Sequence, residues 1–268
     1  MEDFDPDLNY DFFTHSGHNN CVNTSLSQYL EFSSSLKDLS IINFNIRSFH
    51  ANFDRFSAYF SYAEMPSILV LTETWFSVDQ TVEIPGYSGH HIVRNGRSGG
   101  VSVFVKNHIE SFFLPEFSYV SETIEVCSVE IKIQNVHFVI VGIYRPHSDS
   151  IANFTVHLSN FLETSSFISG NCILLGDLNI CLLKDSQPNL EFLNLMYSNH
   201  FIPLITEPTH YSQVEGVVPS LLDHIYINKI FSYACGILDI DITDHLPTYL
   251  HIDLYLRTYH EKLRFNFV

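Results

Sequence analysis

The chain has 268 residues, 46% of them hydrophobic and 14% aromatic, which is enough apolar side chain for one large domain with a substantial core. The formal net charge is −17, yet only 16% of the residues are charged, which excludes a disordered acidic protein. The five cysteines are scattered without a Cys-x-x-Cys pair, so a zinc knuckle and a disulfide framework are excluded as well.

The N-terminal region is acidic and lacks the basic start and apolar stretch of a signal peptide. No apolar run approaches the roughly 20 residues that a membrane helix needs. The excess of acidic residues also argues against a protein that binds nucleic acid through a broad basic face. We therefore expect an intracellular monomer, in the nucleus or cytoplasm, that is not secreted and has no membrane partner.

The first 38 residues differ from the rest of the chain. They carry seven acidic residues against one lysine, are rich in Asn and Ser, and show no sustained apolar period. We expect residues 1–38 to be an acidic, poorly ordered leader. Residues 39–256 should form the folded domain, followed by a C-terminal tail over residues 257–268.

From residue 39 onward, strand and helix signals follow one another. Apolar runs and apolar–polar alternation predict strands over residues 40–44, 68–71, 100–105, 127–133, 136–143, 173–175, 222–227 and 249–254. Apolar side chains at helical spacing predict three helices, over residues 53–63, 151–161 and 190–196. Gln134 and Asn135 are the predicted turn between two neighbouring strands, and Phe53, Phe56 and Phe60 are predicted core residues. Many strands with three helices and no internal repeat predict an α/β (α+β) sandwich.

Polar residues fall at or just beyond the ends of these strands, where α/β enzymes tend to place their sites. They are Asn45, Glu73, Tyr144, Arg145, Asp177, Asn179, Asp223, Thr243, Asp244 and His245. An oxygen-only set that includes Glu73 and Asn45 suits Mg²⁺ or Mn²⁺, which are hard cations. A carboxylate such as Asp177 can orient a water and take its proton, and an acid beside His245 can hold the imidazole as a cation. The set predicts a site that cleaves phosphodiesters with the help of a metal.

Each of these residues also has an ordinary structural interpretation when it is taken alone. The alternatives are an exposed carboxylate for Glu73, a turn residue for Asp177, a helix cap for Asp244, and packed aromatics for Tyr144 and Trp75. Gly99-Gly100 is typical of a turn into a strand. Only the joint occurrence of the polar residues in one order favours chemistry over structure.

Six short motifs carry a resemblance to a known family. They are Ile42-Asn43-Phe44-Asn45, Leu71-Thr72-Glu73-Thr74-Trp75, Gly142-Ile143-Tyr144-Arg145-Pro146, Leu175-Gly176-Asp177-Leu178-Asn179, Ser220-Leu221-Leu222-Asp223-His224 and Thr243-Asp244-His245-Leu246-Pro247. In this order they resemble the apurinic-endonuclease-like branch of the endonuclease/exonuclease/phosphatase superfamily, and within it the endonuclease domain of non-LTR (LINE-type) retrotransposons. The resemblance covers roughly residues 39–254. It implies a four-layer sandwich of two mixed β-sheets flanked by helices.

The resemblance also implies a role for each matching position. The implied catalytic residues are Asn45, Glu73, Tyr144, Asp177, Asn179, Asp223 and His245, and the implied ligands of Mg²⁺ or Mn²⁺ are Glu73, Asn45 and Asp244. Asp177 would activate the attacking water, and Asp223 would orient His245. The implied contacts to the DNA backbone are Arg145, Thr209 and Thr243. The implied activity is nicking of one DNA strand to leave a 3′-hydroxyl, which the reverse transcriptase of the element uses as a primer.

Two alternatives stay open, namely a related nuclease or phosphatase of the same fold and a domesticated binding domain without activity. Several related branches have a second catalytic histidine near the position of Tyr144-Arg145-Pro146, which disfavours them. Retrotransposon proteins continue into a reverse transcriptase, whereas this chain stops about fourteen residues after its last predicted strand. We expect a fragment, a degenerate copy or a captured single-domain gene, with a reverse transcriptase module as a separate or lost partner. The basic residues expected to face DNA are Arg47, Arg94, Arg97, Lys106 and Arg145.

Overall fold

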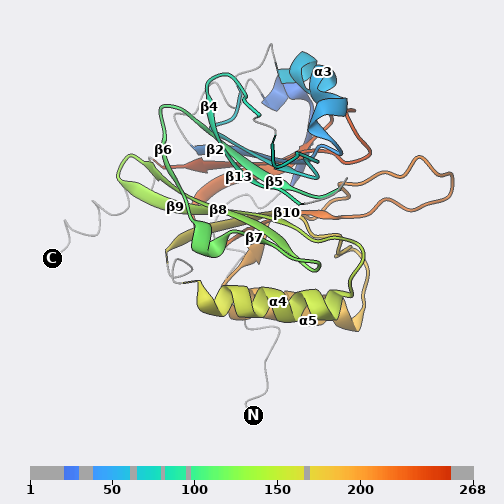
Figure 1. The fold of residues 1–268 in the computed structure, drawn as a ribbon. Helices are drawn as coiled ribbons and strands as arrows, with labels where there is room; N and C mark the ends of the chain where they lie inside the picture. The colour runs from blue at the N-terminus through green and yellow to red at the C-terminus, as the bar shows by residue number, and fades with distance from the viewer. Residues whose placement is uncertain are drawn as a thin grey trace.

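The structure is a computed structural model, and it describes residues 21–29, 39–60, 65–79, 82–94, 98–165 and 170–254. These residues form two mixed β-sheets that stack face to face, with helices on both outer sides (Figure 1). The helix α3 (Phe49–Phe60) lies over the first sheet, and α4 (Ile151–Thr164) and α5 (Gln187–Ser198) lie over the second. The predicted four-layer α/β sandwich is confirmed.

Both sheets mix parallel and antiparallel pairs. The strand order of the first sheet is β1 (Val22–Thr24), β13 (Ser232–Leu238), β14 (Thr248–Asp253), β2 (Leu39–Asn45), β3 (Ile68–Thr72), β5 (Val101–Lys106) and β4 (Tyr87–Ile92). The order of the second sheet is β11 (Ile202–Pro203), β12 (Asp223–Ile227), β10 (Asn171–Asp177), β9 (Val136–Tyr144), β8 (Glu125–Ile133) and β6 (Glu110–Phe113), with β7 (Tyr119–Val120) also paired to β8. The parallel pairs β2–β3 and β9–β10 lie in the middle of their sheets and end at the same edge.

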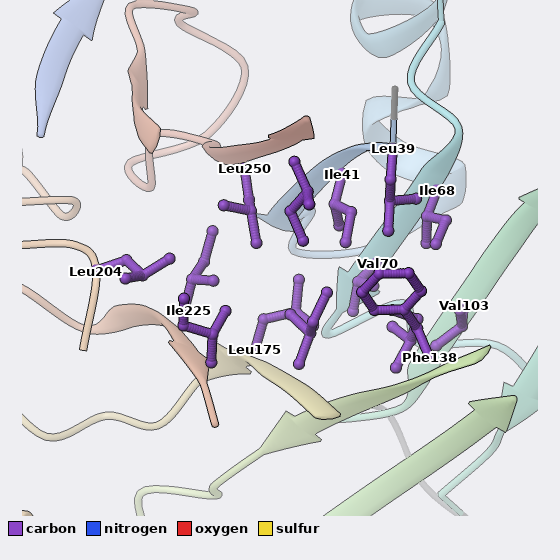
Figure 2. Packing of buried hydrophobic residues seen from close by; sticks show 14 of the residues in the cluster. Leu39, Ile41, Ile68, Val70, Val103, Phe138, Leu175, Leu204, Ile225 and Leu250 are labelled. Atoms are coloured by element: carbon purple, nitrogen blue, oxygen red, sulfur yellow. The ribbon is translucent and has the colours of Figure 1, made fainter. Parts of the chain in front are cut away.

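The main core lies between the two sheets (Figure 2). Successive side chains of a strand point to opposite faces, so every second residue enters this core. In β2 Leu39 and Ile41 enter it, whereas Ile42 and Phe44 pack under α3. A third apolar cluster joins the second sheet to α4 and α5. The strands are therefore buried on both faces, which explains their near-continuous apolar sequences.

Most of the predicted elements are confirmed. The turn at Gln134 and Asn135 joins β8 to β9, and both residues have positive φ (49° and 66°), as a two-residue hairpin turn requires. The helix α4 begins after Ser150, whose hydroxyl accepts a hydrogen bond from the N–H of Asn153 at 3.1 Å. Its predicted stripe, which includes Phe154, is buried against the second sheet.

Two predictions about helix faces are confirmed only in part. Phe56 and Phe60 are buried as predicted, and so is Met196 of the predicted third helix, but other residues differ. Phe53 was predicted to be a core residue, but it is 40% exposed, because α3 turns Phe49, Phe56 and Phe60 toward the sheet instead. In α5 the predicted stripe includes Leu190, which is exposed, whereas Phe192 is fully buried. In both helices several apolar residues compete for one face, and the sheet beneath the helix decides which of them is covered.

The N-terminal region departs from the prediction at residues 22–24. This segment, which was assigned to a poorly ordered leader, forms the edge strand β1 and pairs in parallel with β13. Thr24 is hydrogen-bonded to the hydroxyl of Tyr249 at 3.0 Å, and Tyr29 packs edge-on against the same ring. A three-residue strand gives no periodic signal, because its structure comes from the neighbouring strand. The remainder of the predicted leader, and the predicted tail over residues 257–268, lie outside the described residues.

No helix in the described part of the chain is both long enough and apolar enough to cross a membrane.

Candidate active site

A row of polar residues continues the inter-sheet core at one end of the second sheet. Neighbouring strands place Asp223, Asp177, Tyr144 and Glu125 side by side in register. Asp177, Asp223 and Glu125 each lie two positions from an apolar residue of the core, such as Leu175 before Asp177, and Tyr144 belongs to the core cluster itself, so all four point into the same space. All four side chains are buried or nearly so. The alternation that fills the core with apolar groups thus ends in acids and a phenol.

The first sheet contributes Asn45 and Glu73 to the same place. The amide nitrogen of Asn45 donates to the Glu73 carboxylate at 2.9 Å and to the Asp177 carboxylate at 2.8 Å. The Tyr144 hydroxyl donates to the same oxygen of Glu73 at 3.2 Å. Residues that are up to 132 positions apart in sequence therefore meet across the two sheets. Glu73 and Asp177, which were predicted to belong to one site, are therefore bridged by the side chain of Asn45.

His245 completes the group from the loop before β14. Its Nδ1 lies 2.8 Å from the Asp223 carboxylate, and its side chain lies within 4.8 Å of both Asp223 and Asp177. Burial alone would lower the pKa of His245, but the Asp223 carboxylate raises it well above the ordinary value, and Asp177 and Asp244 act in the same direction. The neighbouring carboxylates therefore favour the cationic form of the imidazole.

Asp177 lies in the most crowded electrostatic position of the site. Burial raises the pKa of its carboxyl, and the neighbouring Asp223 raises it further. The His245 cation, the N–H of Asn179 at 2.9 Å and the Asn45 amide lower it. Asn179 is held in turn by its own side chain, which donates to the Arg145 carbonyl at 2.7 Å. The carboxylate is thus fixed by donors on both oxygens while its basicity is increased.

Three residues that were predicted to contact DNA have internal partners. Arg145 is only 5% exposed, and its guanidinium donates to the backbone carbonyls of Asn179 and Asp149. Thr209 is fully buried, and its hydroxyl donates to Asp223 at 2.8 Å. The Thr243 hydroxyl donates to the Asn45 carbonyl at 3.1 Å. The burial and internal hydrogen bonds of Arg145 and Thr209 argue against contact with DNA, because these side chains support the loops around the site. Thr243 is partly exposed, and its contact with DNA stays a prediction.

Asp244 lies on the wall of the pocket beside one guanidinium and one imidazole. Its carboxylate is paired with the Arg47 guanidinium, and His210 lies 3.4 Å from the same oxygen. Burial would raise the pKa of Asp244, but the Arg47 guanidinium lowers it below the ordinary value. The His210 ring also packs against His245 at 4.7 Å between centroids. Asp244 is therefore an anion that is already neutralised in part by the protein.

The backbone is strained around the site. Residues other than glycine with positive φ include Arg47, Ser48, Glu73, Trp75 and Asn179. Glu73 has a φ of 51°, which turns its side chain out of the strand alternation and toward Asn45. Such conformations cost roughly 1–3 kcal/mol each and persist only where the surroundings hold them. The N–H groups of Thr74 and Trp75 donate to the carbonyls of Gly100 and Gly99, which hold the Glu73 loop in place.

A pocket of about 660 Å³ opens above these residues. Its lining includes Glu73, Tyr144 and His245, the predicted basic residue Arg94, and three residues that the sequence analysis did not assign to the site, namely Glu122, His147 and His210. Arg94 pairs with both Glu122 and Glu125, so this predicted basic residue is present at the rim but is neutralised. Arg97 lies outside the described residues. The strongly acidic balance of the chain therefore extends to the site.

Glu125 is the buried residue that sequence reasoning missed. Its carboxylate accepts the N–H of Gly100 at 2.6 Å and pairs with Arg94 at 3.1 Å. A side chain at Gly99, where φ is +82°, would collide with this carboxylate, so the glycine turn is required there. The signal was present in the sequence, because Glu125 extends the alternation of Cys127, Val129 and Ile131 by one step toward the strand start.

The donor set fits a divalent cation that prefers oxygen. In the described part of the chain, three buried side-chain oxygens of the site have no hydrogen-bond partner: Oδ1 of Asn179, of Asp223 and of Asp244. Unpaired buried acceptors are rare in folded proteins and call for a donor or a cation. The carboxylates of Glu73 and Asp177 lie beside them, and oxygen ligands are those that Mg²⁺ and Mn²⁺ prefer. Asn45 presents its amide nitrogen to the carboxylates and its oxygen to the N–H of Arg47, at 3.1 Å.

The fold and this set of polar residues are found together with a match to a family of nucleases and phosphatases. The model of the Endonuclease/Exonuclease/phosphatase family matches residues 42–245, and the chain belongs to that family. This confirms the predicted resemblance at the level of the superfamily. No curated protein sequence matches the chain.

Several solved structures show the same fold. The endonuclease domain of TRAS1, a telomere-specific non-LTR retrotransposon, has a TM-score of 0.62 and 15% identity, and the match covers 80% of this chain and 98% of that domain. An AP endonuclease from Archaeoglobus fulgidus has a TM-score of 0.61 and 18% identity, with 81% and 100% covered. The APE2 catalytic domain of Xenopus laevis has a TM-score of 0.60 and 16% identity, with 80% and 93% covered. At these identities the likeness concerns the fold alone.

Proposed function

We propose that this protein is a divalent-metal-dependent endonuclease that nicks DNA and leaves a 3′-hydroxyl. The observation that carries the proposal is the meeting of Glu73, Asn45, Asp177 and the Asp223–His245 pair beneath one pocket, which Glu73 and His245 line. Phosphoryl transfer needs mainly the positioning of the reactants and the neutralisation of charge in the transition state. This constellation offers a fixed base, a buried cation and oxygen donors within one site.

In this proposal Glu73 is the principal ligand of Mg²⁺ or Mn²⁺, and Asp244 offers its unpaired oxygen to the same side. The bound ion would polarise the scissile phosphate and stabilise the leaving oxygen. Asn45 was predicted as a further ligand, but it donates to Glu73 and Asp177 here, so we assign it the task of positioning both carboxylates. Tyr144 donates to Glu73 at 3.2 Å, and its hydroxyl lines the pocket where a phosphate would lie.

Asp177 is the proposed base. Its carboxylate is held by Asn45 and by the N–H of Asn179, and its raised pKa makes it a better proton acceptor than an ordinary aspartate. A water beside it would lose its proton to the carboxylate as the oxygen attacks phosphorus. The unpaired amide oxygen of Asn179 is a natural partner for a hydrogen of that water.

His245 is the proposed cation that stabilises the charge on the phosphate oxygens. Asp223 holds the Nδ1 side of the ring at 2.8 Å, which leaves Nε2 as the donor toward the pocket. Thr209 fixes Asp223 by a hydrogen bond from its hydroxyl at 2.8 Å. A donor that is oriented before the reaction costs little reorganisation when charge develops, which makes such groups effective in catalysis.

The choice of DNA as the substrate has support from the surroundings of the pocket and from similar folds. The loop between β11 and β12 projects from the sandwich (Figure 1), and its residue His210 lines the pocket. It carries the exposed apolar residues Tyr211, Val214, Val217 and Val218, which suit contact with a groove better than with a small soluble phosphate. Among the solved structures with this fold are a 3′ phosphatase from Neisseria bound to a product DNA hairpin and a TDP2 from D. rerio complexed with single-strand DNA product. A 3′-hydroxyl at the nick would serve a reverse transcriptase module as a primer.

Conversion of supercoiled plasmid to the open-circular form tests the proposal. We expect nicking with Mg²⁺ or Mn²⁺ and none with EDTA. A DNA polymerase should extend the nick directly, without prior treatment by a phosphatase, because the end is a 3′-hydroxyl. Release of phosphate from an inositol phosphate without nicking would favour a related phosphatase. Failure in both assays by the folded protein would favour a silent binding domain.

A further inference from the structure

Trp75 is more exposed than a tryptophan that packs in a hydrophobic core. It is the single tryptophan of the chain, it follows Glu73 by two residues, and 38% of it is exposed. Its φ of 54° is unfavourable for a bulky residue, and its N–H is fixed by the carbonyl of Gly99 at 3.0 Å. The prediction that it packs holds only in part. A strained backbone that keeps a large aromatic ring at the surface beside a site points to a binding role.

A second pocket, of about 530 Å³, lies beside this ring. It shares Arg47 and Asp244 with the catalytic pocket, so the two pockets are adjacent at this ion pair. Trp75 comes from the loop after β3, whereas Gln213 and Val214 come from the long loop between β11 and β12. We call this space the Trp75 pocket.

The charges in the Trp75 pocket are balanced rather than acidic. Arg47 neutralises Asp244, and Arg55 lies 3.7 Å from Asp241 while it donates to the carbonyl of Ile242 at 2.6 Å. Half of the Arg47 side chain remains exposed, and its guanidinium has donors beyond the one that binds Asp244. The pocket therefore combines a flat aromatic face, a guanidinium and the amide of Gln213. These groups match the face of a nucleobase, a phosphate and the polar edge of a base.

We propose that the Trp75 pocket is a nucleotide subsite, in which a base next to the scissile phosphate stacks on Trp75. Arg47 would contact the phosphate that joins this nucleotide to the one in the catalytic pocket. The inference rests on the proposed function, because it takes the occupant to be part of the strand that is cut. Stacking on an aromatic ring tolerates any base, so the subsite would hold the strand without reading its sequence.

Fluorescence of Trp75 tests the subsite without any need for catalysis, because all tryptophan emission of the protein comes from this residue. The full chain in EDTA is titrated with single-stranded DNA of about ten nucleotides and with a strand of equal length made of abasic sugar–phosphate units. We expect only the strand with bases to change the emission and to protect the indole from acrylamide. Equal effects of both strands, or no effect of the strand with bases, would overturn the subsite.

Substitution provides the second measurement, with affinity read from the anisotropy of a labelled strand. Trp75→Leu should weaken binding of the strand with bases by about five- to a hundredfold and leave binding of the abasic strand unchanged. Trp75→Phe should recover most of the affinity. Phe112→Ala is the matched control, because Phe112 is an exposed aromatic residue on the distant strand β6. A similar loss in the control would overturn the specific role of Trp75.

The failure of the subsite differs from the failure of the proposed function. If plasmid is nicked with Mg²⁺ while Trp75 fluorescence and the Trp75→Leu affinity do not respond to bases, the subsite is wrong and the endonuclease proposal stands. If the folded protein neither nicks plasmid nor binds either strand, the proposed function is wrong and the subsite falls with it.

Discussion

Leu175 and Asp177 lie two residues apart on β10 and point the same way into the space between the sheets. Leu175 packs among apolar residues of both sheets, whereas Asp177 faces Asp223 and depends on Asn45 and His245 for compensation. The apolar part of the inter-sheet core therefore stabilises the fold. At the ends of the same strands, the same register holds acidic side chains close together, which costs stability and increases reactivity.

The difference between Leu175 and Asp177 explains how this fold positions the residues of the site. Parallel strands in the middle of each sheet end at one edge, and the alternation of side chains fixes which residues point inward. A rigid apolar core can therefore position reactive groups without a dedicated loop for each of them. The loops add what the strands cannot, namely the turned-out carboxylate of Glu73 and the imidazole of His245.

The largest expected effect is that of a substitution in the site, which should change activity but not stability. Glu73→Ala should lower the rate of plasmid nicking by about a thousandfold or more, because it removes the principal metal ligand and a main source of charge stabilisation. Its urea midpoint should stay close to that of the wild type. Glu191→Ala, at an exposed site on α5, is the control and should leave both quantities unchanged. A Glu73→Ala protein that nicks at the rate of the wild type would contradict the role of Glu73.

A substitution in the apolar core should have the opposite effect, which is a loss of stability. Leu175→Ala should lower the free energy of unfolding by about 2–5 kcal/mol, because it leaves a cavity in a fully buried cluster. The measurement is urea denaturation followed by circular dichroism. Leu190→Ala, at a leucine that is 51% exposed, should change stability little. Equal losses for the two leucines would mean that the core is not where the structure puts it.

Arg145 tests whether a residue near the site serves the substrate or the fold. Arg145→Met should cost about 1.5–3 kcal/mol of stability, because the carbonyls of Asn179 and Asp149 lose a charged donor. The salt dependence of DNA binding should stay unchanged, since a phosphate contact would lower its slope by about one. A lower salt slope with unchanged stability would restore the DNA-binding role predicted from the sequence.

The last expected effect is spread over a range of pH and concerns the fully buried His224. Burial lowers the pKa of His224 to about 4, so the folded protein binds its proton more weakly than the unfolded chain does, with an ordinary value of about 6.5. Stability from this residue is therefore complete above pH 6.5 and is lost as the pH falls toward 4. His224→Gln should reduce the slope of stability against pH in that window by up to about 1.4 kcal/mol per pH unit. Identical slopes in urea titrations of the two proteins would refute this account of His224.

The sequence predicted the layers of the fold and the main residues of the site, because both depend on signals that are local or fixed by alternation. Apolar runs identified the central strands, and the polar residues at their ends identified Asn45, Tyr144 and Asp177 as neighbours. Edge elements such as β1 and β4 have weaker patterns, and their structure comes from pairing with the next strand.

The remaining differences arose from contacts that no spacing reveals. The orientation of Arg145 and Thr209 toward carbonyls and a carboxylate depends on loops that meet only after folding. The burial of Glu125 was detectable from alternation, but its partner Arg94 lies 31 residues earlier in the chain. The exposure of Trp75 follows from a backbone turn with positive φ, which the Glu-Thr-Trp sequence does not predict.

The central claim is that the proposed active site binds a catalytic metal ion through Glu73. The most direct measurement is anomalous diffraction from crystals soaked with Mn²⁺. We expect one strong peak within about 2.3 Å of a Glu73 carboxylate oxygen, with the Asn45 and Tyr144 hydrogen bonds to Glu73 rearranged around it. Density that appears only at surface acids such as Asp239 and Asp241, with Glu73 still bound to Asn45 and Tyr144, would contradict the claim.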